Sequence, residues 1–227
     1  MDAVGVSVGT RVKLRPRPGG DVFDLALAGR TAVVDIVERD MEGRVHVGVL
    51  VDDDPGQDFG EFGHRFFFSA AEVEPLRVLV AGIGNVFLGD DGFGVALAQR
   101  VGARSDVDVV DFGIRGMDLA YALASYDVAV LLDATPRGGA PGTLYLIEPD
   151  LEDLPLDVDA HAMHPVSVLA LAKTLGGALP RTLVLGCEPA AVEEFTELSA
   201  PVAAALAEAE RLLDNVLTNV LTGKETS

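Results

Sequence analysis

Apolar and polar residues follow one pattern before Pro75 and another after it. In residues 1–75, short runs rich in β-branched and aromatic residues are separated by turn signals, which is typical of β-strands in a small sheet. From residue 76 onward, continuous apolar runs alternate with segments whose apolar residues recur with the period of an amphipathic helix. This change of pattern predicts two domains, residues 1–75 and residues 76–227.

The first domain is predicted to contain strands and no helix. Strands are expected at Arg11–Arg15, Thr31–Val37, Arg44–Val51 and His64–Phe68. The three aromatic residues that end the last run, Phe66 to Phe68, could line a peptide groove. We interpret them as core residues, because a small domain needs its large apolar side chains inside. The strand pattern resembles that of small all-β SH3-like barrels, and we expect that fold.

The second domain alternates strands with helices. Strands are expected at Val78–Ala81, Val107–Asp111, Val128–Leu132, Thr143–Ile147 and Thr182–Gly186, and helices at residues 92–101, 117–126, 166–175 and from Ser199 onward. The segment Ala134–Gly142 is too short for the helix of a parallel crossover, so we expect the fourth strand to run antiparallel to a neighbour. These elements predict an α/β domain in which helices cover both faces of a mixed, mostly parallel five-stranded sheet, as in three-layer phosphorylase/hydrolase-like folds.

The charge balance narrows the classes of partner. Acids outnumber bases 36 to 17, giving a formal net charge of −19, and a surface of this sign repels nucleic acid and anionic lipid. The single cysteine, Cys187, allows no internal disulfide and favours a reducing compartment. The N-terminus lacks the pattern of a signal peptide, and no apolar run reaches the ~20 residues of a membrane span. We therefore expect a cytoplasmic protein with neither a nucleic acid nor a membrane as partner.

Polar residues that could carry chemistry are expected at the carboxyl edge of the α/β sheet. Asp91 follows the first strand, Asp133 ends the third, and His161 and His164 precede the third helix. Ligands bind at this edge of open α/β sheets, and two carboxylates with an imidazole suit a divalent ion such as nickel or zinc. Of the two adjacent acids, we expect Asp90 to cap the following helix and Asp91 to be free for chemistry.

The segments around these positions resemble a known family. They are GIGN at residues 82–85, LGDDGFGV at residues 88–95, LDA at residues 132–134 and GCEP at residues 186–189. All four are similar to motifs of the [NiFe]-hydrogenase maturation endopeptidases. The resemblance covers about residues 77–221 and leaves the first domain to be explained separately.

The resemblance implies an activity, a substrate and roles for the candidate residues. It implies an endopeptidase that removes the C-terminal extension from the large-subunit precursor of a [NiFe]-hydrogenase once nickel has been inserted. The nickel is then carried by the substrate protein, and no organic cofactor is expected. Asp91, Asp133 and a histidine would bind the nickel, and the two aspartates are also the candidate catalytic residues. We favour His161 over His164 because of the apolar spacing in the helix that follows, but the register leaves both open.

Three other interpretations compete with this one. A non-catalytic chaperone that senses metal in the same precursor would need the same ligands. A dinucleotide site would use Gly82 and Gly84, but Phe87 occupies the third glycine position and two acids would face the pyrophosphate. A thiol nucleophile at Cys187 is disfavoured, because a lone cysteine after an apolar strand is usually a small buried residue.

Overall fold

The computed structural model describes residues 5–17, 26–52, 54, 64–152, 164–194 and 197–222. The chain divides into two compact units: the first comprises the chain up to Leu76 together with the chain from Asn215 onward, and the second comprises Arg77–Asp214. The division after Leu76 lies beside the predicted domain boundary. The sequence did not predict that the end of the C-terminal helix belongs to the first unit. Whether residues 1–75 fold by themselves stays a prediction.

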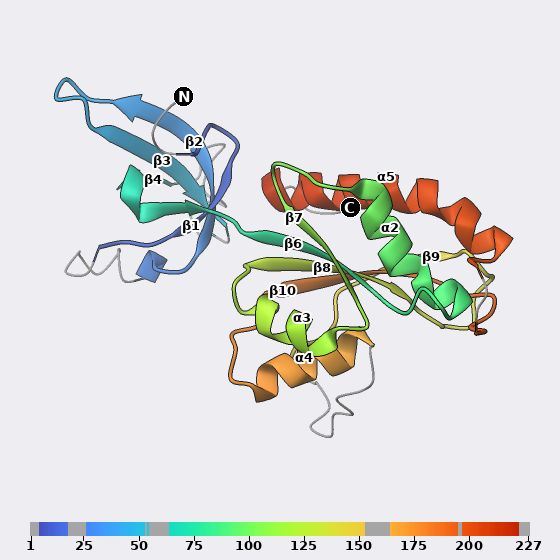
Figure 1. Cartoon of the computed structure of the whole chain (residues 1–227). Helices are drawn as coiled ribbons and strands as arrows, with labels where there is room; N and C mark the ends of the chain where they lie inside the picture. The colour runs from blue at the N-terminus through green and yellow to red at the C-terminus, as the bar shows by residue number, and fades with distance from the viewer. Residues whose placement is uncertain are drawn as a thin grey trace. The chain divides into compact units, whose positions relative to one another are not determined.

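The first unit contains a five-stranded antiparallel sheet in the order β4-β3-β2-β1-β5 (Figure 1). Its strands are β1 (Arg11–Leu14), β2 (Thr31–Arg39), β3 (Val45–Val51), β4 (Arg65–Ser69) and β5 (Val73–Pro75). The four predicted strands are confirmed. Phe68 lies in the core and Phe66 packs against it, whereas Phe67 points to the other face and is exposed.

The barrel prediction for the first domain is not confirmed, because the sheet is open among the residues that the structure describes. β4 pairs with β3 and β5 pairs with β1, so the two ends of the sheet do not meet. After β4, the 3₁₀ turn η2 (Ala70–Glu72) leads the chain to β5, which lies beside β1 and is only three residues long. Closure requires the two edge strands to pair with each other, and alternating strand patterns do not report whether they do.

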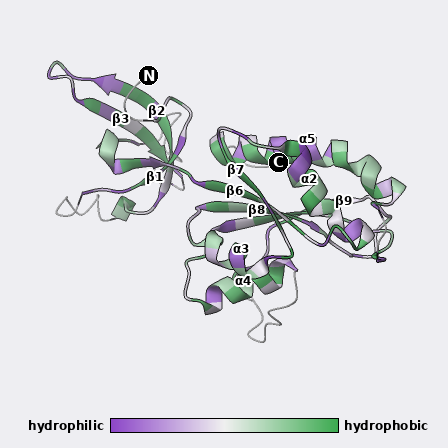
Figure 2. Cartoon of the chain, viewed as in Figure 1, coloured by the Kyte–Doolittle hydropathy of each residue, from purple (hydrophilic) through white to green (hydrophobic). Residues whose placement is uncertain are grey.

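The second unit has the predicted mixed α/β sheet, in the order β7-β6-β8-β10-β9. The strands are β6 (Val78–Ile83), β7 (Asp108–Gly113), β8 (Val128–Ala134), β9 (Leu144–Ile147) and β10 (Arg181–Cys187). β9 runs antiparallel to β10, as predicted from the short preceding segment, and the other pairs are parallel. Every residue of β6 and β8 is buried, which explains their continuous apolar runs (Figure 2).

Helices cover both faces of this sheet (Figure 1). They are η3 (Gly89–Gly92), α2 (Phe93–Val101), α3 (Gly116–Leu123), α4 (Pro165–Thr174) and α5 (Ala200–Thr222). α3 and α4 close one face, where apolar residues of β6, β8 and both helices form a core cluster. α2 covers the other face, and α5 is joined to the end of α2 by the Arg100–Glu210 ion pair. None of the helices described in the chain is both long and apolar enough to cross a membrane.

Candidate active site

Asp91 and Asp133 come together at the carboxyl edge of two neighbouring strands. Asp133 is the next-to-last residue of β8, and Asp91 lies in η3 just beyond β6, which pairs with β8. Only 4% of Asp133 is exposed. Burial raises the pKa of its carboxyl well above the usual range, the negative charge of Asp91 raises it further, and a hydrogen bond from the Ala134 backbone offsets part of the rise. The structure therefore places two carboxyl groups close together at this edge, where burial and the charge of Asp91 oppose the ionisation of Asp133.

Asp91 is partly exposed and is held by the loop that leaves β6. The backbone N–H of Asn85 donates to its Oδ2 (2.6 Å). Gly84, with φ of 117°, brings the strand end against η3 so closely that a Cβ there would overlap the carbonyl oxygen of Asp91. A side chain at Gly84 would both strain the backbone and displace Asp91, which explains why the motif needs a glycine.

α2 lies directly on the backbone that leads to Asp133. A Cβ at Gly94, in the first turn of α2, would overlap the carbonyl oxygens of Leu132 and Ile83. Since Leu132 precedes Asp133 in β8, the contact fixes the helix against the strand at the depth of the acid. Gly94 is therefore required for close helix–sheet packing rather than for an unusual backbone angle.

Asp90 does not cap α2, which has Gly92 at its N-cap and no side-chain cap. Its carboxylate, with 1% of the residue exposed, accepts hydrogen bonds from the backbone N–H groups of Ala190 (2.7 Å), Ala191 (3.1 Å) and Ser199 (2.7 Å) and from the Ser199 hydroxyl (2.8 Å). Burial alone would raise the pKa of Asp90, but these hydrogen bonds outweigh it and the pKa is lowered. The cap prediction is wrong, because the donors come from a loop 100 residues along the chain that local sequence cannot reveal.

The third predicted ligand is not brought to the two aspartates by the described residues. His164 is exposed at the N-cap of α4, and its side chain makes no capping hydrogen bond. His161 lies outside the residues that the structure describes. In the described ranges, no group of three or more His, Cys, Asp or Glu side chains is arranged to hold a metal ion. The carboxylate pair is thus present, and the choice between the two histidines stays open.

A third buried acid at the same edge, Glu188, was missed by the sequence reasoning. It follows β10, is 5% exposed, and accepts hydrogen bonds from the Tyr145 hydroxyl (2.7 Å) and from the backbone N–H groups of Arg137 (2.8 Å) and Gly138 (3.0 Å). The hydrogen bond from Tyr145 and those from the 137–139 backbone lower the pKa of Glu188, although burial opposes them. Glu188 therefore holds the loop after β8 in place. The sequence feature that could have pointed to Glu188 is its position in the GCEP motif, directly after a buried strand.

Cys187 is fully buried at the end of β10. Burial, followed by the negative charges of Asp90 and Glu188, raises the pKa of its thiol to about 11. Because the thiolate is the nucleophilic form, this thiol is inert at neutral pH, as expected from its position after an apolar strand.

Comparisons with known proteins agree on one family. A family model described as hydrogenase maturation protease matches residues 94–215, more than half of the chain. The hydrogenase expression/formation protein HupD of Rhodobacter capsulatus is 34% identical over 154 residues, covering 62% of this chain and 72% of that protein. The hydrogenase 2 maturation protease of Escherichia coli K12 is 29% identical over 151 residues, covering 63% of this chain and 89% of that protein.

The fold agrees with these matches. The solved structure of the hydrogenase maturating endopeptidase HybD from E. coli superposes with a TM-score of 0.54 at 24% sequence identity, covering 64% of this chain and 94% of that one. The extent of the family match and the identity to the R. capsulatus relative show that the chain belongs to the hydrogenase maturation protease family, a family of peptidases.

Proposed function

We propose that the chain is a cytoplasmic endopeptidase that removes a C-terminal extension from the large-subunit precursor of a [NiFe]-hydrogenase after nickel insertion. Asp91, Asp133 and one histidine, His161 or His164, recognise the nickel that the precursor carries. The pairing of Asp91 with the buried Asp133 at the carboxyl edge of the sheet is the observation that carries the proposal.

The carboxylate pair suits a divalent ion that arrives with the substrate. Burial and the charge of Asp91 disfavour the ionised form of Asp133, and a cation beside its carboxyl would favour that form. Carboxylate oxygens together with an imidazole nitrogen fit nickel. Binding of the ion and ionisation of Asp133 are therefore coupled.

The two acids then differ in what they can do. Asp91 is partly exposed, whereas Asp133 is almost fully buried. An ion held between them polarises the carbonyl of a nearby amide, and the carboxylate of Asp91 is the group placed to accept a proton from attacking water. Nothing in this arrangement requires an organic cofactor.

The main alternative is a non-catalytic chaperone that binds the nickel-loaded precursor through the same ligands. The peptidase membership of the family favours cleavage. A dinucleotide site is less favoured, because the third glycine position holds Phe87 and the Asp90 carboxylate is bound to the loop that precedes α5.

The test is to incubate the full chain with purified precursor, nickel-loaded or nickel-free, and to measure the mass of the precursor. We expect loss of the C-terminal peptide only from the loaded form. Asp91→Ala and Asp133→Ala should each abolish the loss, and His161→Ala or His164→Ala will identify the third ligand. Glu208→Ala is the matched control, since Glu208 is an exposed acid within α5 that has no place in the proposed site. A stable complex without any change of mass would support the chaperone instead.

A further inference from the structure

Exposed apolar side chains gather at the sheet edge that holds Asp91 and Asp133. Among the described residues of the second unit, six large exposed apolar residues follow the carboxyl end of a parallel strand or begin a helix at that edge: Val86, Phe87, Ile114, Met117, Val166 and Val192. We call these six residues the apolar rim. Three others in the same unit, Tyr121, Leu146 and Leu175, lie away from the edge. Scattered exposed apolar residues are ordinary, but their concentration in one place is typical of an interaction surface.

The loops that carry the rim are held by hydrogen bonds next to the aspartates. The Phe87 N–H donates to Oδ1 of Asn85 (3.0 Å), and Asn85 is itself bonded to Asp91. The Gly84 N–H donates to the carbonyl of Gly113 (3.1 Å), so the loop with Ile114 lies beside the loop with Phe87. Because these positions are already ordered, burying them against a partner costs little conformational entropy.

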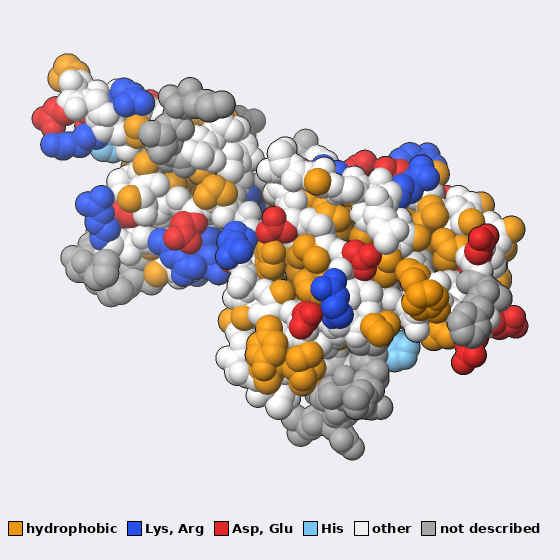
Figure 3. Space-filling view, viewed as in Figure 1, with side chains coloured by type: hydrophobic (Ala, Val, Ile, Leu, Met, Phe, Trp, Pro, Cys, Tyr) orange, Lys and Arg blue, Asp and Glu red, His pale blue; other side chains and the backbone are white. Residues whose placement is uncertain are grey.

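One side of the rim can be followed on the surface. Figure 3 shows hydrophobic side chains gathered over the first turn of α2 and the loop that precedes it. This is the loop that contains Val86 and Phe87, which are 51% and 65% exposed. The apolar surface therefore reaches the element from which Asp91 projects.

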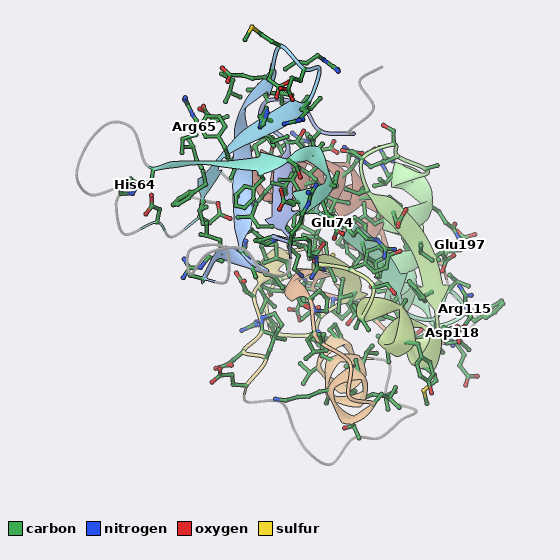
Figure 4. All side chains as sticks on the ribbon, turned by 90° about the vertical axis from the view of Figure 1, so that its left-hand side faces the viewer. His64, Arg65, Glu74, Arg115, Asp118 and Glu197 are labelled. Atoms are coloured by element: carbon green, nitrogen blue, oxygen red, sulfur yellow. The ribbon has the colours of Figure 1, made fainter. Side chains whose placement is uncertain are left out.

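The burial of Asp133 limits what can occupy the site. Because only 4% of Asp133 is exposed, a narrow occupant such as an ion or an extended chain suits this place better than a broad folded surface. Acids flank the rim: Glu193 and Glu194 follow Val192, and Asp118 follows Met117 and projects outward from α3 beside Arg115 (Figure 4). With a net charge of −19, the surroundings favour a cationic partner.

We propose that the apolar rim binds, in an extended conformation, the segment of the precursor that contains the bond to be cut. Apolar side chains of that segment lie on the rim, and basic residues beside them meet the flanking acids. The inference rests on the proposed function and adds the substrate segment and its chemistry. The rim thus selects the segment, while the aspartates respond to the metal.

The test compares the rim variants Phe87→Ser and Ile114→Ser with Leu175→Ser, an apolar residue that is 43% exposed at the C-cap of α4, away from the carboxyl edge. At 65% and 62% exposure, the rim residues can be replaced without unfolding, which the unfolding midpoints should verify. We expect each rim variant to raise KM for the nickel-loaded precursor by about tenfold with kcat nearly unchanged, as for loss of one interface anchor. Leu175→Ser should behave as the wild type.

A second measurement separates this inference from the proposed function. Binding of the precursor and of the mature large subunit is measured by calorimetry in the Asp91→Ala background, where no cleavage is expected. If adding Phe87→Ser weakens the binding of the precursor but neither the wild type nor any variant cleaves it, the inference about the rim is supported and the proposed function is wrong. If both rim variants cleave the precursor with an unchanged KM, the inference about the rim is wrong and the proposed function is supported. If Phe87→Ser instead dissociates a dimer seen by light scattering and leaves precursor binding unchanged, the rim joins two copies of this chain and the inference is wrong.

Discussion

Replacing Asp90 by alanine tests whether this acid holds the loop before α5 rather than capping a helix. The substitution removes the acceptor for three backbone N–H groups and one hydroxyl, all from Ala190, Ala191 and Ser199. None of the three residues is itself buried, so after the substitution water can reach part of the donors. The structure therefore predicts a large but not catastrophic loss of stability.

The magnitude follows from the number of bonds and from their accessibility. A hydrogen bond to a charged group contributes ~1.5–3 kcal/mol, and an unsatisfied buried donor costs ~1–3 kcal/mol. Four such bonds share one acceptor, so their losses are not additive. Rehydration of the exposed N–H groups reduces the sum further, and we expect Asp90→Ala to lower the free energy of unfolding by ~3 kcal/mol. For a chain of this size that corresponds to roughly 10 °C in the unfolding midpoint.

Calorimetry of Asp90→Ala, Asp91→Ala and Asp118→Ala provides the assay. Asp91 accepts one backbone hydrogen bond, and its removal relieves Asp133 of a neighbouring charge, so we expect a change within ~1 kcal/mol. Asp118 should change nothing measurable. Because the pKa of Asp90 is lowered, its contribution to stability is present above its unfolded-state pKa and is lost as the pH falls through the folded-state value. A wild-type midpoint for Asp90→Ala, or a larger loss for Asp91→Ala, would show that the hydrogen bonds do not have this role.

Three further predictions follow from burial and from the division of the chain. Asp133→Asn should abolish processing and raise the free energy of unfolding by ~0.5–2 kcal/mol at neutral pH. Because the pKa of Asp133 is raised, this gain in stability over the wild type should shrink in acid, and a loss of stability at neutral pH would contradict the argument. Cys187, with a pKa of about 11, should resist alkylation at neutral pH until the chain unfolds, and rapid labelling of the native protein would contradict its burial. A chain that begins at Leu76 should fold and keep the Asp91–Asp133 pair but bind precursor more weakly, whereas insolubility would mean that the two units share a core.

The secondary structure of the α/β unit could be predicted because its local signals agree with its tertiary surroundings. The runs that became β6 and β8 are apolar throughout and are buried on both faces. The short Pro- and Gly-rich segment after β8 left no room for a crossover helix, and β9 indeed runs antiparallel. In the first unit the strands could be predicted equally well, but barrel closure depends on which edges meet, and that information is not in the strand pattern.

The contacts around the site were predictable only where they are local. Asp91 is tied to Asn85, six residues away, within one recognisable motif. Asp90 and Glu188 depend on donors about 100 and 50 residues away, so their roles require the fold. A buried acid at a strand end indicates that partners exist, but the sequence does not say which.

Asp90 and Asp91 show how neighbouring residues of one type acquire opposite properties. The Asp90 carboxylate is saturated by donors and its pKa is lowered, so it has nothing to gain from a cation. Asp91 instead lies beside Asp133, where burial and the charge of Asp91 oppose the ionisation of Asp133. Under the proposed function, the ion of the precursor would bind the Asp91–Asp133 pair, whereas Asp90 holds the loop before α5. Asp90 therefore stabilises the fold while Asp133 is expected to destabilise it, and the gain in stability expected for Asp133→Asn measures the cost of a carboxyl at this buried position.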